Sequence, residues 1–515
     1  MVWKVETSNG CEATKTKWRL VPYTRGRVLD IGCGPDKAFP HFIGVDNGHH
    51  SKFGYKIRPD IWANADKIDL VANESCDAVF SSHLLEHIPY EHVADVLSEW
   101  WRCIKVGGYL CLYLPDEDEY PPVGHEHANP DHKWNVNYGK VLSQMKEVGS
   151  WDLVEFEKCN KDDEYSLFFS FKKLESGKNK YSYQNPKPDK TCAVVRYGAF
   201  GDLMMASSVL AGLKKQGYHT TLYTSPPGSD VITHDPNIDQ IILQEKDQVP
   251  NQALGEFWEF LAKRYDKFVN LSESVEGTFL ALPGRAQHAW PHDVRHRMLN
   301  YNYVQFQHEL AGVPHEPKVR FYPTEEERQW AERERAKMLG RVVMWSLIGS
   351  SVHKRNPHVD AIVARFMLTM PDVHVILVGG PEAEMLEAGW ENEKRVIKTC
   401  GKWSIRQTLS MVEKCDLIIG GETGVLNAAS CLEVPKILFL SHSSAENLSR
   451  DWVNTISLEP DKKEVPCFSC HQLHYGWTFC KKDEDSGTAM CQVRITPDMI
   501  WRAVEQSMTK ARVAA

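Results

Sequence analysis

The sequence lacks any long apolar run. Its longest apolar stretches lie around residues 342–348 and 373–378, and both are far shorter than the roughly 18 residues that cross a bilayer. The first ten residues also lack the apolar segment of a secretory signal. We therefore expect a chain without a transmembrane segment that works in the cytoplasm, where thiols stay reduced.

An excess of positive charge is missing as well. The chain has 60 Lys and Arg residues against 69 Asp and Glu, a formal charge of -9. The protein therefore has no overall positive electrostatic potential that would attract the phosphate backbone of nucleic acids, although a local basic groove is compatible with this net charge. With 515 residues, 42% of them hydrophobic, the composition is globular and predicts two or three domains.

Apolar strand-like runs alternate with helical patterns in three series. The first includes RVLDIG, the second begins with CAVVRYG at Cys192, and the third begins with VVMWSLIG at Val342. This alternation predicts an α/β fold of three Rossmann-like units, with parallel sheets covered by helices on both faces. A polar, proline-containing stretch separates the first two series and indicates a linker. The expected domains are 1–175, the linker 176–190, 191–325 and 326–515, and the last helix, near 497–512, is expected to pack across the second domain.

The first series opens with a strand that ends in a turn of small residues. In VLDIGCGPDK, residues 28–37, Asp30, Gly32 and Gly34 allow the backbone to bend so that a ligand can approach main-chain N–H groups. Asp46 ends the next strand, where a carboxylate can hold the hydroxyls of a ribose, and Asp66 follows the third. An ordinary turn without a ligand is the alternative.

Together these segments resemble the class I S-adenosylmethionine-dependent methyltransferases over residues 20–175. The resemblance implies that Asp30, Gly32 and Gly34 hold the methionine end of S-adenosyl-L-methionine, Asp46 its ribose and Asp66 its adenine. Pro35 and Asp36 depart from the family, which commonly has another small residue after the second glycine. Methyl transfer depends mainly on positioning, so a strong base is not required.

Two segments of this domain are rich in histidine. The run from His83 to His87 matches the H-x-x-E-H zinc-peptidase pattern, but its place after the fourth strand favours the start of a helix beside the cofactor. The loop 124–134 contains His125, His127 and His132. It lies near the acceptor site of the methyltransferases that the domain resembles. A role in the acceptor site, a surface loop with incidental histidines and a metal site are all open for it.

Two sequence motifs that are missing narrow the chemistry of the methyl acceptor. There is no Asn-Pro-Pro-Tyr type of sequence after the fourth strand, and the one Pro-Cys pair, Pro466-Cys467, lies outside this domain. Both are marks of methylation on DNA bases. A sugar hydroxyl, a small molecule or another oxygen or nitrogen acceptor fits the sequence better.

The later series contain two more turns of the same kind. Arg196-Tyr-Gly198-Ala-Phe-Gly201-Asp202 joins a strand to a helix, and capping of that helix is the alternative to a catalytic role for Asp202. In the third series, Ser350 and Lys354 follow a strand. Glu422-Thr423-Gly424 opens a helix whose free N–H groups can hold a diphosphate.

These segments resemble the heptosyltransferases of glycosyltransferase family 9, which have the GT-B fold, over residues 191–510. The resemblance implies that Asp202 is the base for the acceptor hydroxyl and that Lys354 steadies the departing nucleotide diphosphate. It also implies a donor site that is formed by Ser350, Glu422, Thr423 and Gly424. The sequence departs from the family at Glu422 and Asn427, where the family has Asp and His, and a non-catalytic cleft is the alternative.

Four of the 14 cysteines crowd into the segment 467–491: Cys467, Cys470, Cys480 and Cys491. In a reducing compartment such a group suits a structural, tetrahedral zinc site, for which His471 and His474 are substitute ligands. Unligated thiols and disulfides are the alternatives.

The sequence as a whole predicts a bifunctional transferase. One half would transfer a methyl group from S-adenosyl-L-methionine, and the other a sugar from an ADP-heptose-like nucleotide sugar, with inversion, to a glycan or small-molecule acceptor. Joining both activities in one chain raises the effective concentration of a shared acceptor. The alternatives are a virus-type enzyme that hypermodifies DNA bases, and a scaffold with one inactive half.

Overall fold

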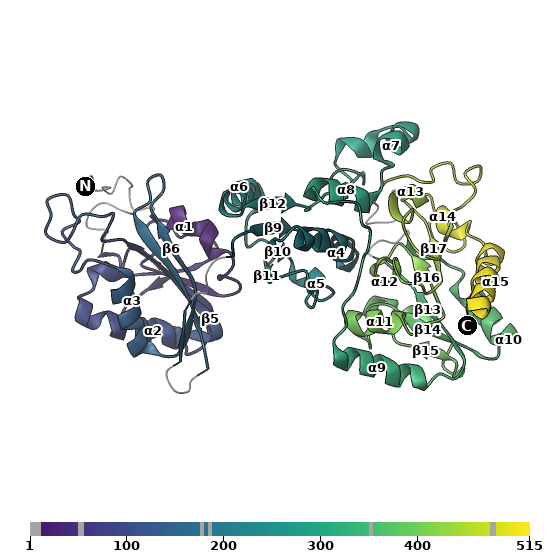
Figure 1. Ribbon diagram of the computed structural model, residues 1–515, viewed down its shortest axis with the longest axis horizontal. Coiled ribbons are helices and arrows are strands. Elements are labelled where there is room, and N and C mark those ends of the chain that lie inside the picture. Colours follow the sequence, from purple (N-terminus) through teal and green to yellow (C-terminus); the bar gives the residue numbers. More distant parts are fainter. Residues whose placement is uncertain are drawn as a thin grey trace. The chain divides into compact units, whose positions relative to one another are not determined.

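The computed structural model describes residues 12–49, 56–175, 180–183, 188–349, 354–473 and 480–514 (Figure 1). It forms two compact units. Unit 1 contains Met1–Asp189 and Leu243–Lys263, and unit 2 contains Lys190–Ile242 and Arg264–Ala515. Within the described ranges, no helix is both long and apolar enough to cross a membrane.

Unit 1 is built on a sheet with the strand order β3-β2-β1-β4-β5-β7-β6-β8. The strands from β3 to β5 pair in parallel, whereas β7 pairs antiparallel with both β5 and β6. The sequence predicted parallel strands, and it did not predict the antiparallel pairing of β7 with β5 and β6. The strands are β1 (Val28–Ile31), β2 (Ile43–Asp46), β3 (Ile61–Trp62), β4 (Cys76–Ser82), β5 (Ile104–Pro115), β6 (Trp151–Cys159), β7 (Ser166–Lys173) and β8 (Tyr181–Ser182).

Helices cover this sheet with their apolar faces. In α2, Val93, Val96, Leu97 and Trp100 are buried and recur at helical spacing. In α6, Phe257 packs its ring against that of Trp18 in α1. The helical elements of unit 1 are α1 (Glu12–Leu20), η2 (Leu85–His87), η3 (Tyr90–His92), α2 (Val93–Cys103), α3 (Tyr138–Val148), η4 (Asn251–Ala253) and α6 (Leu254–Arg264).

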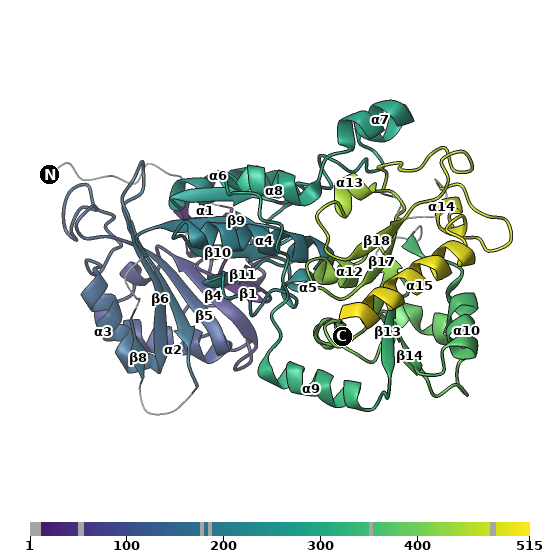
Figure 2. The ribbon, with the colours of Figure 1, turned by 45° about the vertical axis from the view of Figure 1, so that its right-hand side comes forward.

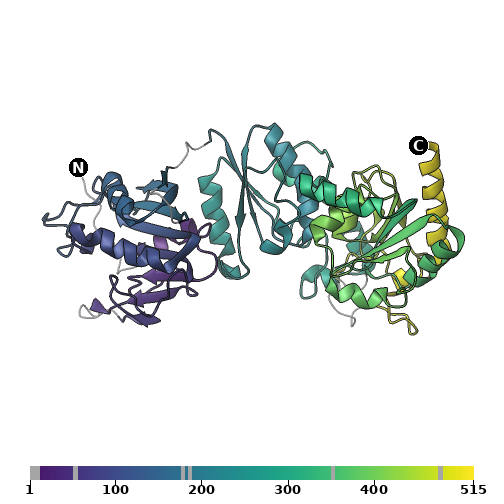
Figure 3. The same ribbon diagram turned by 90° about the horizontal axis from the view of Figure 1, so that it is seen from below.

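Unit 2 contains two parallel sheets. The first has the order β11-β10-β9-β12, and the helices Phe200–Lys215 and Tyr303–Ala311 contact its strands (Figure 3). Its strands are β9 (Thr191–Val195), β10 (His219–Thr224), β11 (Gln240–Leu243) and β12 (Lys267–Asn270). The helical elements of this part are α4 (Phe200–Lys215), α5 (Pro226–Ser229), η5 (Ala286–Ala289), α7 (His292–Leu299) and α8 (Tyr303–Ala311).

The second sheet has the order β15-β14-β13-β16-β17-β18, with every pair parallel. Its strands are β13 (Arg341–Ser346), β14 (Val373–Val378), β15 (Val396–Lys398), β16 (Leu417–Gly421), β17 (Lys436–Phe439) and β18 (Thr455–Leu458). The helical elements are α9 (Glu325–Ala336), α10 (Val359–Thr369), η7 (Pro381–Glu387), α11 (Ile405–Val412), α12 (Gly424–Ala429), α13 (Ala445–Leu448), α14 (Met490–Val493) and α15 (Pro497–Ala514). The predicted α/β class is confirmed.

The C-terminal helix α15 lies on this second sheet of unit 2 (Figure 2). Ile500, Trp501 and Val504 are buried in the same cluster as Phe366 of α10, and the rings of Phe366 and Trp501 meet edge to face at 5.2 Å. The expectation that this helix packs across the second domain is therefore wrong. The apolar face of α15 finds its partner next to the sheet that it follows in the chain.

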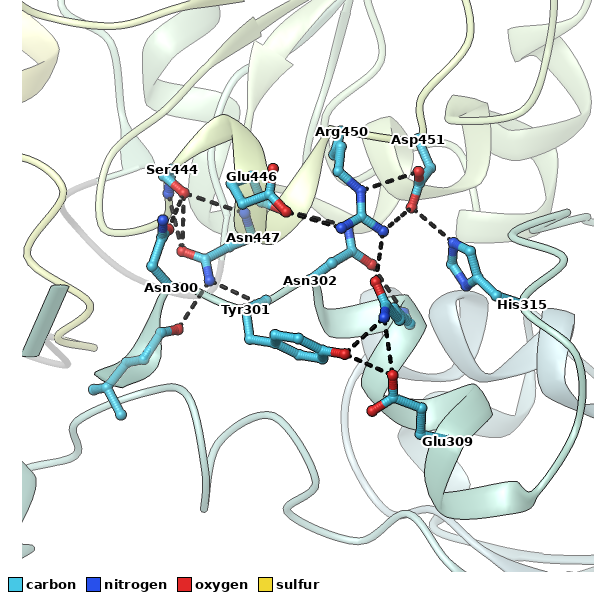
Figure 4. A network of polar contacts seen from close by, with 12 residues as sticks. Asn300, Tyr301, Asn302, Glu309, His315, Ser444, Glu446, Asn447, Arg450 and Asp451 are labelled. Carbon is cyan, nitrogen blue, oxygen red and sulfur yellow. Dashed lines mark hydrogen bonds and ion pairs between the residues drawn. The ribbon is translucent and has the colours of Figure 1, made fainter. Parts of the chain in front are cut away.

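A polar network joins the segment around α8 to α13 (Figure 4). The Asn447 Nδ2 donates to the carbonyl oxygens of Leu299, at 2.9 Å, and Tyr301, at 2.8 Å. The Asn302 Nδ2 donates to the carbonyl oxygen of Glu446 at 3.2 Å, and Arg450 donates to Gln305. The network thus connects segments of unit 2 that are far apart in the sequence.

Candidate functional sites

The turn after β1 contains two glycines, Gly32 and Gly34, at which any residue with a side chain would have a strained backbone. Gly32 has a φ of 72° and Gly34 a φ of 56°, which is the left-handed region that favours glycine. A Cβ atom on Gly32 would lie 2.8 Å from Leu84 Cδ2, whereas one on Gly34 would meet nothing within 4 Å. The turn is therefore packed tightly on one side and open at Gly34.

Two carboxylates hold this turn in place. Asp30 is 1% exposed, and its Oδ2 accepts a hydrogen bond from the N–H of Ala38 at 2.8 Å. Asp46 accepts from the N–H of Gly34 at 3.1 Å and from that of Gly48 at 2.6 Å. Burial raises the pKa of Asp30 to about 7, against the lowering effect of the hydrogen bond from Ala38.

Four of the five predicted cofactor residues thus come together at the carboxyl ends of β1 and β2. These strands are neighbours in the sheet, with Ile31 paired to Val45. Asp66 lies exposed in the turn after β3, and no contact between its side chain and Asp46 is seen among the described residues. Its role at the adenine stays a prediction.

A second group of polar side chains lies at the carboxyl end of β4. Ligand atoms of Glu86, His87 and His132 all lie within 4.8 Å of one another. Glu86 is fully buried, and its Oε1 is 3.5 Å from the Nδ1 of His83 and 3.8 Å from the Nε2 of His132. Burial, together with the positive charge of the neighbouring His87, lowers the pKa of both His83 and His132 to about 3.

The structure corrects the interpretation of residues 83–87 as the start of a helix. His83 has a φ of 47°, which is uncommon for a residue with a side chain. It is followed by the short 3-10 turn η2, and the α-helix begins only at Val93. Of the three histidines predicted in the loop 124–134, His132 joins Glu86, whereas His125 and His127 are exposed.

Unit 2 contains a cavity of about 870 Å³, lined by residues from both of its parts: from the helices and loops around the first sheet and from the part built on the second. The lining includes the predicted residues Asp202, Lys354, Glu422, Thr423 and Gly424, together with Glu276, Tyr303, Asn427 and His442. Five of the six residues predicted for glycosyl transfer therefore share one cavity. The sixth, Ser350, lies outside the described residues.

Asp202 belongs to a partly buried group of three charged residues, of which Arg196 is the fully buried one. The Nη2 of Arg196 lies 3.0 Å from the Oδ1 of Asp202, and the same guanidinium contacts both oxygens of Glu276 at 2.9 and 3.2 Å. The Asp202 Oδ2 also accepts from the N–H of Ala199 at 2.8 Å, so the predicted capping contact exists as well.

The pKa values of the two acids in this group move apart. Burial raises the pKa of Asp202 to about 6; Arg196 and Lys354 oppose this rise, and Glu276 adds to it. Burial alone would also raise the pKa of Glu276, but the charge and hydrogen bonds of Arg196 lower it overall. Asp202 is thus the acid of the pair that takes up a proton near neutral pH.

The amino ends of α4 and α12 approach each other at two glycines. A Cβ on Gly201 would lie 2.9 Å from the Asn427 Nδ2, and one on Gly424 would lie 3.2 Å from the N atom of Gly201 and 3.1 Å from the Cβ of Phe200. Only residues without side chains allow this distance. The close approach brings Asp202, at the third position of α4, to the same side of the cavity as the start of α12.

Glu422 is bound within the protein. Its carboxylate accepts from the N–H of Ser441 at 2.6 Å and from the hydroxyls of Ser441 and Ser443 at 2.9 and 3.1 Å, and it lies 2.8 Å from the Nδ1 of His442. Burial would raise the pKa of Glu422, but the charge and hydrogen bond of His442 lower it well below the usual range. Glu422 therefore places an imidazole at the cavity wall.

Thr423 acts as the cap of α12. Its hydroxyl accepts from the N–H of Leu426 at 3.5 Å and shares a hydrogen bond with Ser346 at 3.1 Å. Sequence reasoning identified Thr423 but missed Glu276 and His442. No local motif marks either of them, since each reaches the cavity through a strand-to-helix loop of another part of the chain.

The four clustered cysteines are free thiols in the structure, which contradicts the disulfide alternative. Burial raises the pKa of Cys470 to about 12 and that of Cys480 to about 11. Within the part of the chain that the structure describes, no three of the four sulfurs lie at the spacing of a metal site. His471 contacts His296 at 2.9 Å, and His474 lies outside the described residues. The zinc site stays a prediction.

With this geometry in view, comparison with protein families gives one match. The family described as "Methyltransferase domain" matches residues 29–112, which run from β1 through β4 and most of β5. Residues 29–112 form a methyltransferase domain. The expected class of enzyme, a transferase, is thereby confirmed.

Solved structures resemble each unit separately. Glycosyl transferase family 9 from Veillonella parvula is 17% identical, with a TM-score of 0.46, and the match covers 62% of this chain and 98% of that one. ADP-heptose lps heptosyltransferase II from E. coli is 15% identical, with a TM-score of 0.44, and covers 62% and 99%. An S-adenosylmethionine-dependent methyltransferase from Archaeoglobus fulgidus is 20% identical, with a TM-score of 0.23, and covers 31% and 94%. No curated protein matches the chain significantly. At these identities the likeness concerns the fold.

Proposed function

We propose that the chain is a bifunctional transferase. Unit 1 transfers a methyl group from S-adenosyl-L-methionine, and unit 2 transfers a sugar from a nucleotide sugar with inversion. The observation that supports the second activity best is the pairing of Asp202, whose pKa is raised to about 6, with Arg196 and Glu276 at the wall of a large cavity. A general base is most effective when its pKa lies near the working pH.

In unit 2, Asp202 acts as the base. Its carboxylate accepts the proton of the acceptor hydroxyl while the acceptor oxygen bonds to the anomeric carbon and the bond from that carbon to the diphosphate breaks. The side chain of Lys354 lines the same cavity and stabilises the negative charge that develops on the leaving diphosphate. Arg196 keeps Asp202 oriented, and Glu276 keeps its proton affinity high by repulsion.

The residues of unit 1 fit the methyl donor. The space beside Gly34 is open, since a Cβ there would meet no atom within 4 Å, and Asp46 fixes the backbone of the turn through Gly34 and Gly48. When bound, S-adenosyl-L-methionine supplies an activated methyl group. The turn from Gly32 to Gly34 would hold its methionine end, and the carboxylate of Asp46 would bind its ribose.

Several finer points belong to this proposal. The donor sugar is ADP-heptose-like, the acceptor is a glycan or a small molecule, and the chain works in the cytoplasm. The four clustered cysteines hold a structural zinc ion. Tetrahedral thiolate sites of this type stabilise small loops.

The glycosyl transfer is tested with the purified full chain and a panel of nucleotide sugars, by measuring the nucleoside diphosphate that is released in the presence of candidate glycans. We expect release from one donor and a loss of at least about 100-fold in kcat for Asp202→Asn, the scale of general-base catalysis. Asp293→Asn is the matched control, because Asp293 is also in the first turn of a helix, α7, but is exposed and outside the cavity. Equal rates for wild type and Asp202→Asn would refute the role of Asp202.

A further inference from the structure

Unit 1 contains a cluster of metal-type ligands that the methyl-donor turn does not use. Its members are Glu86 and His87, from the 3-10 turn after β4, and His132, from the loop after β5. One ligand atom of each lies within 4.8 Å of the others. Ligands that each lie about 2.1 Å from one ion are about 3.4 Å apart in a tetrahedral site, so the three side chains must approach one another by up to about 1.4 Å to close around a cation.

The cluster is held by contacts that do not use its ligand atoms. The main-chain N–H of Lys133 donates to the carbonyl oxygen of Glu86 at 2.7 Å, and the indole Nε1 of Trp134 donates to that of Leu85 at 3.0 Å. These two bonds fasten the loop that contains His132 to the turn that contains Glu86. The side chains are thus preorganised from outside, in the way that outer contacts orient the ligands of metal centres.

His132 shows that the cluster is not explained by ordinary core packing. The residue is 6% exposed, yet its Nε2 has no hydrogen-bond partner among the described residues and stands 3.8 Å from a buried carboxylate oxygen. A buried polar nitrogen without a partner is unfavourable by about 1–3 kcal/mol. The separation is too long for a hydrogen bond but suits two ligands of one ion.

His83 holds the carboxylate from the other side. Its Nε2 is fixed by the hydroxyl of Ser166 at 2.9 Å, and its Nδ1 faces the Oε1 of Glu86 at 3.5 Å. The backbone of His83 is left-handed, with a φ of 47°. Strain of this kind is concentrated at functional sites, and His83 is a positioning residue for Glu86.

The cluster lies beside the methyl-donor turn. β1 and β4 are neighbours in the sheet, with Ile31 paired to Ser81, and Gly32 packs against Leu84, two residues before Glu86. The turn for the donor and the ligand cluster therefore share the carboxyl edge of two adjacent strands. In parallel sheets this edge is where ligands bind.

We propose that Glu86, His87 and His132 bind a divalent transition-metal ion of the class that accepts nitrogen and oxygen ligands, and that its open position takes an oxygen of the methyl acceptor. Two histidines and one carboxylate form a ligand set for such ions, with room for a further ligand. The second part of the proposal rests on the proposed methyl transfer. There the cation lowers the pKa of the acceptor hydroxyl, whose proton passes to water. The acceptor oxygen then bonds to the methyl carbon as the bond from that carbon to sulfur breaks.

The metal site is tested by titrating the metal-free full chain with Co²⁺ and counting the bound ions, with the visible spectrum recorded in parallel. We expect the wild-type chain to bind one more equivalent of Co²⁺ than either the His132→Ala or the His87→Ala variant. The spectrum of this additional ion should lack the charge-transfer band that a thiolate ligand produces. That band separates it from any ion at the four clustered cysteines. His92→Ala is the control, because His92 is an exposed histidine of the same unit, and it should bind as wild type does.

Two further measurements keep the outcome clear. Binding of S-adenosyl-L-methionine should be unchanged in both variants, which shows that they are folded and that the donor turn is intact. Equal cobalt equivalents in wild type and in both variants would overturn the metal site. If wild type binds the extra ion but transfers no methyl group to any acceptor, the metal site stands and the proposed methyl transfer fails.

Discussion

Arg196 and Asp202 lie 3.0 Å apart, and the same guanidinium binds Glu276 at 2.9 Å. One cation is thus shared between two carboxylates inside unit 2. The arginine is 1% exposed, so solvent screens the three charges only weakly. The arrangement divides the two acids into one that stays ionised, Glu276, and one whose pKa is raised, Asp202. This asymmetry supports the proposed role of Asp202 as proton acceptor, with Glu276 as a supporting charge.

Glu276→Gln tests the division of labour directly. The negative charge of Glu276 raises the pKa of Asp202, so its removal should lower that pKa. Activity that needs ionised Asp202 rises with pH through this pKa, about 6 in the wild type. The acid limb of the kcat profile should therefore move to lower pH in the variant. Glu273→Gln, an exposed neighbour that contacts Arg285, should leave the profile in place. An acid limb that stays near pH 6 in Glu276→Gln would show that the limb belongs to another group.

Gly424→Ala tests the close approach of α4 and α12. The new Cβ would lie 3.2 Å from the backbone N of Gly201 and 3.1 Å from the Cβ of Phe200, and neither is the end of a flexible side chain. Overpacking of this kind destabilises proteins by about 1–3 kcal/mol. We expect a lower melting temperature by calorimetry and weaker binding of the nucleotide sugar. Gly255→Ala should instead keep or raise the melting temperature, because Gly255 is helical and a Cβ there meets nothing within 4 Å. Two variants of equal stability would contradict the close approach.

Asp30→Asn tests the buried acid of the methyl-donor turn. The pKa of Asp30 is raised by burial to about 7, whereas an unfolded Asp titrates at about 3.9. Between these values the folded state binds the extra proton, so the contribution of Asp30 to stability falls as pH rises from about 4 to about 7. An amide oxygen can still accept from the N–H of Ala38, without the charge. The difference in melting temperature between variant and wild type should thus grow in favour of the variant over this range, and a difference that is constant with pH would be evidence against the raised pKa.

The sequence predicted a site well where the residues of that site lie close together in the chain. Gly32, Gly34 and Asp46 lie on consecutive strands and a turn, and their pattern alone placed them correctly beside one another. Asp202 was equally visible, because strand, glycine turn and helix follow directly in the chain. Local hydrogen bonds and left-handed glycines are encoded within a few residues of where they act.

The contacts that the sequence did not reveal depend on pairings between distant parts of the chain. Glu276 reaches Arg196 because β12 pairs with β9, which brings the loop after Asn270 to that after Val195. His132 reaches Glu86 only because the chain returns after β5 to the end of β4. Spacing in the sequence does not show such contacts. The pattern of residues 83–87 was misread for another reason: Ile88, which precedes Pro89, is extended, so the turn over Leu85–His87 ends before it becomes a regular helix.

Asn447→Ala tests the polar network of Figure 4. Asn447 is fully buried, and its amide Nδ2 is the donor to the carbonyl oxygens of both Leu299 and Tyr301. Its Oδ1 also accepts from the hydroxyl of Ser444. An alanine leaves these buried groups without that partner, and each unsatisfied group is unfavourable by about 1–3 kcal/mol. We therefore expect a fall in the free energy of unfolding of at least about 2 kcal/mol, measured by urea denaturation of the full chain.

The control variant is Arg450→Ala, which removes a peripheral, more exposed member of the same network. Exposed ion pairs contribute about 0–1 kcal/mol, so its effect should be the smaller of the two. A larger loss in Arg450→Ala than in Asn447→Ala would mean that charge, and not the buried amide, holds α8 and α13 together.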